Sequence, residues 1–579
     1  MSLISSLNGT FLGLRDTEAR LNVTSQNVAN ADRAGYSRKE NTSIYTTVPS
    51  GTFPTSGIIE SISLDPYLHA TLVEDLSSAS YVGVLSDYLS SYVDRLGNVS
   101  GDATLNAQLD DLAASLSQLS VLPEDAGLKA QVVADARALA QQISGMAGAI
   151  QDLRLQADQD IGQTVTDLNT VLQEIDDLNR KVIEAEALGR TTAEYEDLRR
   201  VALEELSGYI DFDYFVDSDN RLQIYTSGRP LVTNDALSLS YTASSLVDST
   251  VVYPGGFSSI DFNGVDLTSS VSGGRIGALV ELRDSTFVDE QAKLDEFASV
   301  LMDLMNGLLN EGASVPSRPS MIGDVEGLTT ADAFAATGIV RIATTDQSGV
   351  VQNFADINLT AFANVGDVIN GINAALGGDV TASLTADGEL QLVANNAGEG
   401  ISINEMTSAV APDSDGFAAY FELNNLFDGT NAETIAIAEY LDANPAYLAT
   451  GRLTSGALAV GDTGVFVGEG DLALALSQSV TGSASFAAAG NFAAQTNSLD
   501  SYADNILSDI ARQASSTRQT SDNVTLLMEQ TQTQFQNLIG VNIDEEMTKI
   551  IDLEAKYQAA ARLISVIQDM FDELLASVR

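Results

Sequence analysis

The chain has 579 residues, 80 acidic and 28 basic side chains, a formal net charge of −52 and no cysteine. This length allows about three to four domains, and the acidity argues against nucleic acid or an anionic membrane surface as partner. The absence of cysteine excludes disulfides. No run of about 18 apolar residues occurs, so no membrane span is predicted, and the N-terminal residues lack the pattern of a cleaved signal peptide.

The N-terminal end carries a heptad repeat. Its members are Leu3, Leu7, Thr10, Leu14, Thr17, Leu21, Thr24 and Val28. A period of 3.5 residues places them on one stripe of a helix, and such a stripe needs a partner surface. The following stretch from Gly35 to Gly57 is rich in Gly, Ser, Thr and Pro, and it predicts an extended linker with short strands.

A long helical pattern extends from about Pro66 to Gly208. No proline occurs between Pro123 and Pro230, which favours long helices packed as a bundle. We therefore expect this part of the chain to form a helical trunk.

The pattern changes to a period of two from Asp211 onward, and Asn263-Gly264 predicts a tight hairpin. A helical run is expected again from Asp289 to Leu309. Between residues 316 and 490 the chain is rich in Ala, Gly, Thr and Asp, with a second hairpin predicted at Asp387-Gly388. Helices are expected to return at Asn491. An inserted β-rich region thus interrupts a helical trunk.

The C-terminal end carries an unbroken apolar repeat about four heptads long. Its members are Ile550, Leu553, Tyr557, Ala560, Ile564, Ile567, Phe571, Leu574 and Val578. Asn542 and Glu545 have the spacing of a capping box and predict where this helix begins. Two partners fit the stripe: the N-terminal helix of the same chain and the termini of neighbouring subunits. An ordinary core-facing helix is the alternative.

Charge is distributed unevenly along the chain. The first 40 and the last 40 residues together carry only −3, so nearly all of the acidity lies between them. Low charge suits close packing of identical copies, whereas the acidic middle suits a solvated exterior. Terminal helices with an unpaired stripe are marginal alone, so we expect them to be mobile in the free subunit and ordered in a polymer.

Candidate catalytic and metal-binding residues are few. His69 is the only histidine, which leaves no His-rich metal site, and its position predicts a helix surface. A calcium loop is disfavoured because Arg221 stands where an oxygen ligand is needed among Asp211, Asp213, Asp217 and Asp219. Gly468-Glu-Gly-Asp471 is one fragment of a calcium-repeat motif. A glycosidase-like carboxylate pair is an alternative that no spacing supports. We expect no enzyme, no metal and no cofactor.

Motifs at both ends resemble those of one protein family. They are Ser25-Gln-Asn-Val-Ala-Asn-Ala-Asp-Arg-Ala-Gly-Tyr-Ser-Arg38, Leu538-Ile-Gly-Val-Asn-Ile-Asp-Glu-Glu-Met547 and Tyr557-Gln-Ala-Ala-Ala-Arg-Leu-Ile-Ser565. The family is that of bacterial flagellar rod, hook and hook-associated proteins. One departure is that Arg33 and Ala34 replace the usual Thr-Pro. Losing the proline loosens the predicted helix end near Asn30, although Gly35 can still stop the helix.

Three internal stretches favour the hook–filament junction members over the hook and rod members. They are Glu196-Asp-Leu-Arg-Arg200 through Leu206-Ser207, Gly273-Gly-Arg-Ile-Gly-Ala-Leu-Val-Glu-Leu-Arg-Asp284 and Asn364-Val-Gly-Asp-Val-Ile-Asn-Gly-Ile-Asn373. The resemblance implies an α+β fold with a terminal coiled coil, a long-helix trunk and inserted β-rich outer domains. The expected divisions are a terminal assembly domain (1–45 with 536–579), a helical trunk (46–210 with 286–315 and 491–535), a β-rich domain (211–285) and an outer α/β domain (316–490).

The heptads and the resemblance together predict an assembly interface and no catalytic centre. Its residues are Leu3, Leu7, Leu14, Leu21, Val28, Asn27, Asn30, Gly35, Tyr36, Ile550, Leu553, Tyr557, Ile564, Ile567, Phe571, Leu574 and Val578.

The resemblance also implies partners and a location. The partners are further copies of the chain in a helical layer, the flagellar hook protein, a second hook–filament junction protein, and a cytoplasmic export chaperone on the C-terminal helix. Export through the flagellar type III apparatus, which uses no cleaved signal, implies an extracellular place in the flagellum. Nucleic-acid binding and membrane insertion are not expected. A hook or rod subunit and an acidic extracellular adhesin are the alternatives.

Overall fold

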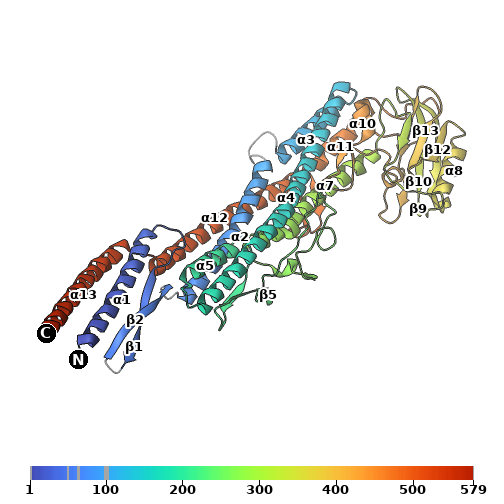
Figure 1. Ribbon diagram of the computed structural model, residues 1–579. Coiled ribbons are helices and arrows are strands. Elements are labelled where there is room, and N and C mark those ends of the chain that lie inside the picture. The colour runs from blue at the N-terminus through green and yellow to red at the C-terminus, as the bar shows by residue number, and fades with distance from the viewer. Residues whose placement is uncertain (1–2, 49–50, 62–64, 97–103, 578–579) are drawn as a thin grey trace.

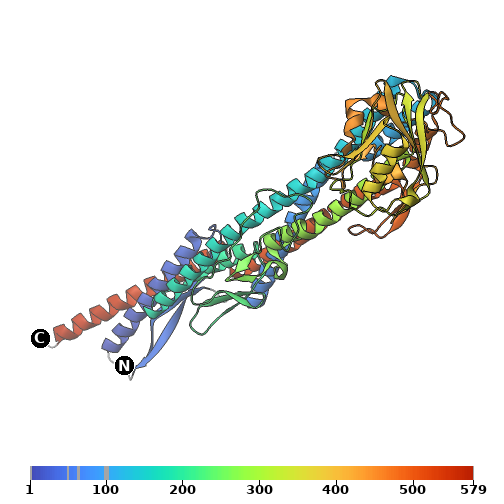
Figure 2. The same cartoon turned by 90° about the vertical axis from the view of Figure 1, so that its right-hand side faces the viewer.

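The computed structural model describes residues 3–48, 51–61, 65–96 and 104–577. The chain is extended along one axis, with both termini at one extremity and an inserted β-rich domain at the other (Figure 1). A view turned by 90° shows the same succession of terminal helices, helical trunk and outer domain (Figure 2). This architecture confirms the predicted α+β class with packed terminal helices and small antiparallel sheets.

Two helices and one hairpin form the terminal unit. α1 (Leu3–Ala29) packs along α13 (Ile543–Ser577), and β1 (Lys39–Val48) pairs with β2 (Gly51–Ser61) beside them (Figure 1). The expected linker is thus a long antiparallel hairpin, because its Thr, Ile and Tyr residues favour strands. Asn542 caps α13 as predicted, since its side-chain oxygen accepts from the backbone N–H groups of Asp544 (3.0 Å) and Glu545 (3.3 Å).

The trunk is a bundle of long helices around one continuous core. Its longest helix has 62 residues and therefore spans about 90 Å. Along that helix Leu168, Ile175 and Val182 are fully buried at intervals of seven residues. The trunk helices are α2 (Pro66–Leu96), α3 (Leu105–Val121), α4 (Ala126–Ala187), α5 (Ala193–Ser207), α6 (Gly274–Glu281), α7 (Phe287–Asn310), α11 (Asp471–Thr481) and α12 (Leu499–Ile539).

Two helix starts differ from the sequence-based expectation. The run expected from Asp289 begins earlier, as α6, and continues through a π turn (Leu282–Thr286) into α7. The helix expected from Asn491 begins later, at Leu499, where the Ser498 hydroxyl accepts from the backbone N–H of Ser501 (3.2 Å). A hairpin of β18 (Ser483–Phe486) and β19 (Gln495–Ser498) occupies the preceding segment.

The β-rich segment after α5 lies against the trunk. β3 (Asp213–Val216), β4 (Leu222–Thr226) and β5 (Arg229–Val232) form one sheet, and β6 (Asp261–Phe262) pairs with β7 (Val265–Asp266). The turn between β6 and β7 is the predicted Asn263-Gly264, and both residues have positive φ, of 51° and 81°.

The outer domain has a core of its own. One sheet has the order β11-β10-β14, a second has the order β12-β13-β8, and α8 packs on β12 and β11. The hairpin predicted at Asp387-Gly388 joins β12 to β13. The elements are β8 (Ser320–Ile322), β9 (Ala336–Thr337), β10 (Ile339–Asp346), β11 (Val351–Asn358), α8 (Val365–Ala375), β12 (Val380–Leu384), β13 (Leu390–Ala394), β14 (Glu399–Asn404), β15 (Ala409–Val410) and α9 (Phe417–Tyr420).

After α9 the chain returns to the trunk through β16 (Phe427–Asp428), β17 (Ala436–Ile437) and α10 (Glu439–Ala443). The return is fixed beside the point of departure, because the Asn310 side-chain amide at the end of α7 donates to the Asn425 side chain (2.8 Å). Phe421 and Leu423 belong to the outer core, whereas Leu426 and Phe427 belong to the trunk core.

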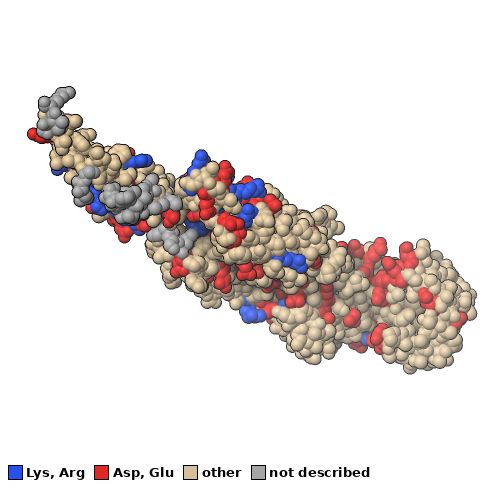
Figure 3. All heavy atoms as spheres, turned by 60° about the horizontal axis from the view of Figure 1, so that its bottom comes forward, with Lys and Arg blue, Asp and Glu red and all other residues tan. Residues whose placement is uncertain are grey.

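Charge follows the long axis of the molecule. In the face shown in Figure 3, Lys and Arg side chains gather on the terminal unit and trunk, whereas Asp and Glu dominate toward the outer end. Residues 316–490 contain no lysine and three arginines, all of which have partners. Arg318 stacks on Tyr440, Arg341 pairs with Asp356, and Arg452 pairs with Glu311. Among the described helices, none has a stretch apolar enough to cross a bilayer.

Candidate functional site

The packed pair of α1 and α13 covers part of the predicted seam. On α13, Leu553 and Ile567 are buried, Ile550, Ile564 and Phe571 are half-buried, and Tyr557 and Leu574 are 39% and 52% exposed. On α1, the predicted residues Leu3, Leu7, Leu14, Leu21 and Val28 are all half-buried. Val578 lies outside the described residues. Of the two partners considered for the C-terminal stripe, the N-terminal helix of the same chain occupies it.

A second apolar stripe on α13 was not predicted and faces solvent. Ile551, Leu563, Val566 and Met570 are between 51% and 66% exposed. With exposed Ala555 and Ala559 they recur every three or four residues and therefore share one face of the helix. The stripe lies beside the predicted seam. Because two of its six positions are alanines, its apolar periodicity is difficult to recognise in the sequence.

Asn27 connects the end of α1 to β1 and α13. Its side chain is 1% exposed, and its amide donates to the Lys39 carbonyl (2.9 Å) and to the Glu546 carboxylate (2.9 Å). Its oxygen accepts from the Lys39 backbone N–H (3.0 Å) and from the Tyr36 hydroxyl (3.0 Å). Burial, with the nearby Asp197 and Glu546 carboxylates, raises the pKa of Tyr36 to about 12. Asn27 thus uses four hydrogen bonds to hold three segments together.

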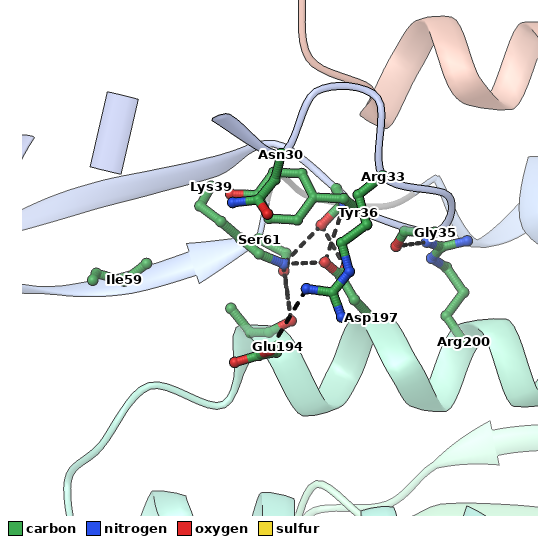
Figure 4. Close-up of polar contacts among 12 residues, drawn as sticks. Asn30, Arg33, Gly35, Tyr36, Lys39, Ile59, Ser61, Glu194, Asp197 and Arg200 are labelled. Atoms are coloured by element: carbon green, nitrogen blue, oxygen red, sulfur yellow. Dashed lines mark hydrogen bonds and ion pairs between the residues drawn. The ribbon is translucent and has the colours of Figure 1, made fainter. Parts of the chain in front are cut away.

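Lys39 joins the start of β1 to α5 of the trunk (Figure 4). Its side chain is 7% exposed, and its ammonium pairs with the Asp197 carboxylate and donates to the Ser37 hydroxyl (3.1 Å), the Ser61 hydroxyl (2.8 Å) and the Ala193 carbonyl (2.9 Å). Asp197 also accepts from the Ser37 backbone N–H and hydroxyl. Burial lowers the pKa of Lys39, and Asp197 opposes that shift.

The loop after α1 is fitted closely to α5. α1 ends at Ala29, and Gly35 has φ +74°, with Val201 packed so closely that a Cβ would lie 2.4 Å from its methyl group. Arg200 of α5 donates to the Gly35 carbonyl (2.7 Å). Arg38 donates its backbone N–H to the Ile539 carbonyl (2.8 Å) at the end of α12. Only glycine fits this approach, so the loop can follow the trunk surface at this point.

A pocket of about 230 Å³ lies between this loop and α5. Tyr36, Lys39 and Asp197 line its inner side, and Arg33 faces Glu194 at 3.9 Å (Figure 4). Asn30 also lines the pocket, and its side-chain amide donates to the Gln26 carbonyl within its own helix end (2.8 Å). Arg33, one of the two residues that depart from the expected Thr-Pro, therefore lines this pocket.

The prediction for His69 was wrong. His69 is 6% exposed, its Nδ1 lies 2.7 Å from the Tyr214 hydroxyl, and its Nε2 lies 3.4 Å from Glu204. The ring packs against Phe535 of α12, because this face of α2 is covered by α5, α12 and β3. In the described part of the chain, no group of three or more His, Cys, Asp or Glu side chains could hold a metal ion.

Known proteins give a consistent picture of this architecture. Residues 90–320 match the family described as the flagellar hook-associated protein FlgK helical domain, and residues 532–577 match the flagellar basal body rod FlgEFG protein C-terminal family. Comparison with curated protein sequences gives no match. Among solved structures, the chain is similar to the flagellar hook junction protein FlgK from Burkholderia pseudomallei, with a TM-score of 0.50 and 15% identity over 80% of this chain and 99% of that chain.

Packed terminal helices, a matching helical domain and a matching C-terminal segment define an axial structural subunit of the bacterial flagellum. Within that class residues 90–320 match the helical domain of the flagellar hook-associated protein FlgK, and the chain is accordingly a structural protein of the hook–filament junction outside the cell. This result confirms the predicted family, function and location.

Proposed function

We propose that the chain builds the junction by polymerising through its terminal unit. The observation that carries this proposal is the exposed apolar stripe on α13, defined by Ile551, Leu563, Val566 and Met570. One face of α13 is already used within the subunit, so this second face is free to receive a neighbouring copy. The predicted residues that face α1, among them Leu553 and Ile567, are buried and hold α13 against α1, so the stripe remains on the outer face of the pair.

The stripe is adequate for a repeated contact. Full burial of four such side chains contributes roughly 6 to 12 kcal/mol gross, and these are about half exposed, so docking recovers roughly 3 to 6 kcal/mol per stripe. A contact between unlike faces that does not close into a ring extends into a helical layer, where each subunit has several neighbours. The low net charge of both ends limits the repulsion between copies in that layer.

In this account residues 1–45 with 536–579 act in assembly. Asn27 and Tyr36 hold α1, β1 and α13 together, and Gly35 seats the connecting loop on α5 of the trunk. Asn30 belongs to the same predicted motif, but its side chain bonds within its own helix end. The two end faces of the layer meet the hook protein on one side and a second junction protein on the other. Support comes from the match of residues 90–320 to the helical domain of the flagellar hook-associated protein FlgK and from the likeness in fold to a flagellar hook junction protein.

The same stripe also suits an export chaperone. An exposed apolar face is an aggregation hazard before secretion, and a small helical chaperone that covers α13 through the type III export stage would remove it. Chaperone and neighbouring subunit would then compete for one surface, so the chaperone leaves before the subunit docks.

Two experiments test these proposals. In a strain without the chain, electron microscopy is expected to find hooks present and filaments absent, and normal filaments would contradict the junction role. Calorimetry with the export chaperone is expected to give binding with a negative heat-capacity change for the full chain and none for a chain that ends at Leu538. Full-length Val566→Asp with Met570→Asp is the matched variant, because it keeps α13. Equal affinity for all three proteins would place the chaperone site elsewhere.

A further inference from the structure

Strand β3 has one unpaired edge. It pairs with β4 only, because the strand order of this sheet is β3-β4-β5. The Asp217 N–H donates to the Arg221 carbonyl (2.9 Å), which fixes the alternation of backbone bonds along the two strands. Phe215 therefore bonds to β4, whereas the N–H and carbonyl groups of Tyr214 and Val216 point away from it. In the described part of the chain, no backbone group pairs with them on that side.

A groove of about 870 Å³ lies along this free edge, between β3 and α2. Buried Val73 of α2 and buried Ile210 line it, and so do Phe215 and Val216, which are 52% and 50% exposed. An edge strand beside a partly apolar groove fits an extended segment that adds a strand to the sheet, because main-chain hydrogen bonds and apolar side chains are satisfied together. The groove therefore points to an extended polypeptide as its occupant.

Charge narrows the choice of segment. The charged side chains that line the groove are Glu74, Asp211 and Asp213, and no lysine or arginine lines it. Asp211 accepts from the backbone N–H groups of Ser272 and Gly273 (both 3.3 Å). An acidic segment, such as those of the outer domain, would be repelled by these carboxylates, so the occupant is uncharged or basic.

The β1–β2 hairpin has the matching properties. Its strands have 10 and 11 residues and form a two-stranded sheet, so each has an edge that no other described strand covers. Residues 41–59 contain no Asp, Glu, Lys or Arg. The hairpin extends from the trunk toward the termini, away from the β3-β4-β5 sheet of its own copy (Figure 1). Only the hairpin of another copy can therefore lie in the groove.

We propose that β3 receives the β1–β2 hairpin of a neighbouring copy as an additional strand. This inference rests on the proposed assembly through the terminal unit, and it adds a contact with the trunk to the contact made by the α13 stripe. A parallel copy displaced along the long axis by up to about 30 Å, one strand length, brings its hairpin beside β3. The hairpin and the groove are unlike surfaces, so the contact repeats from copy to copy without closing on itself.

Disulfide cross-linking tests the pairing, because the chain has no cysteine of its own. Flagella are isolated from cells that make two variants, one with Phe215→Cys and one with a single cysteine at one of residues 42–47. Oxidation is expected to give dimers whose yield alternates along residues 42–47, since successive side chains of a strand point to opposite faces. Val460→Cys, at a position 64% exposed, replaces Phe215→Cys as the control and should give none.

A second pair of variants tests the backbone bond itself. Val216→Pro removes the outward N–H while the bonds between β3 and β4 remain, and Val216→Thr keeps that N–H. With Phe215→Cys present, Val216→Pro should lower the cross-linked fraction roughly two- to tenfold, the effect of one hydrogen bond, and Val216→Thr should not. Hydrogen exchange of β4 verifies that the sheet is intact in both.

The outcomes separate this pairing from the junction role. Flagella that carry filaments but give no dimers at any hairpin position would refute the pairing and leave the junction role intact. Dimers of Phe215→Cys with itself would show that two grooves face each other, and they would also overturn it. Filaments on a strain without the chain would instead refute the junction role. If a cysteine variant is not incorporated, the same pairs are oxidised in concentrated solutions of the full chain and judged by the same criterion.

Discussion

Replacing Asn27 by alanine removes the four hydrogen bonds that join α1, β1 and α13. Three of the lost bonds are to neutral groups, worth about 0.5 to 1.5 kcal/mol each, and the bond to the Glu546 carboxylate is worth about 1.5 to 3 kcal/mol. Allowing for relaxation, we expect the terminal unit to open more easily by roughly 3 to 5 kcal/mol. The Lys39 N–H and carbonyl, which are left without a partner, account for much of this loss.

The assay is hydrogen exchange of the monomer, because the ends and the trunk open separately and a single unfolding transition would not resolve them. A loss of 3 kcal/mol corresponds to roughly a 100-fold drop in protection for residues 37–41 and 543–550. Trunk amides in α4 should not change.

Asn30→Ala is the matched control for Asn27→Ala. Asn30 belongs to the same predicted motif, but its amide bonds only to a carbonyl of its own helix end, so the loss should stay below about 0.5 kcal/mol. If both variants lowered protection equally, Asn27 would not be the connection described.

Three further predictions concern the same region. Val566→Asp with Met570→Asp should change the stability of the monomer by no more than about 1 kcal/mol and abolish polymers, as seen by electron microscopy. Ile567→Asp should instead detach α13 within the monomer, at a cost of several kcal/mol. Polymers formed by the first variant would show that the stripe is not the contact between copies. Lys39→Met leaves the Asp197 carboxylate buried without its cation, and it should weaken the attachment of the hairpin to α5 by about 3 to 5 kcal/mol. Lys556→Met removes an exposed ion pair and should have little effect. Hydrogen exchange of residues 37–61 measures both. In the wild-type monomer, the amide hydrogens of residues 3–40 and 541–577 should exchange faster than those of α4, because few side chains of these segments are buried. Equal protection would contradict the prediction that the ends are mobile in the free subunit.

Periodicity predicted the elements that depend on local pattern. The heptads located the terminal helices that pack together, and Asn263-Gly264 and Asp387-Gly388 located two hairpins, because each signal is contained within a few neighbouring residues. The hairpin at residues 39–61 was underestimated because glycine and serine suggested a linker where Thr and Ile formed strands.

Contacts between distant segments could not be predicted in this way. Asp197 lies 158 residues from Lys39, and no pattern in either segment indicates that they pair. Asp197 and Arg200 both lie in the stretch 196–200, which supported the resemblance to the junction members. Their charge within that stretch is the one signal in the sequence that could have indicated a contact with the N-terminal segment. His69 was misplaced because burial by α5, α12 and β3 is a property of the tertiary fold.

The side-by-side arrangement of Asn310 and Asn425 has a consequence for how such chains vary. The outer domain leaves and rejoins the trunk within one hydrogen bond of 2.8 Å, so its removal or replacement leaves the trunk helices on the same paths. Residues 451–465, which bond to β10, β11 and β14, are the further segment that a replacement domain has to accommodate. The domain can therefore grow, shrink or be exchanged between lineages as a unit, while the trunk keeps its length and the terminal helices keep their spacing. A foreign domain whose two ends lie equally close could be grafted at the same point, which would make the tip of the subunit a display platform on the outside of the flagellum.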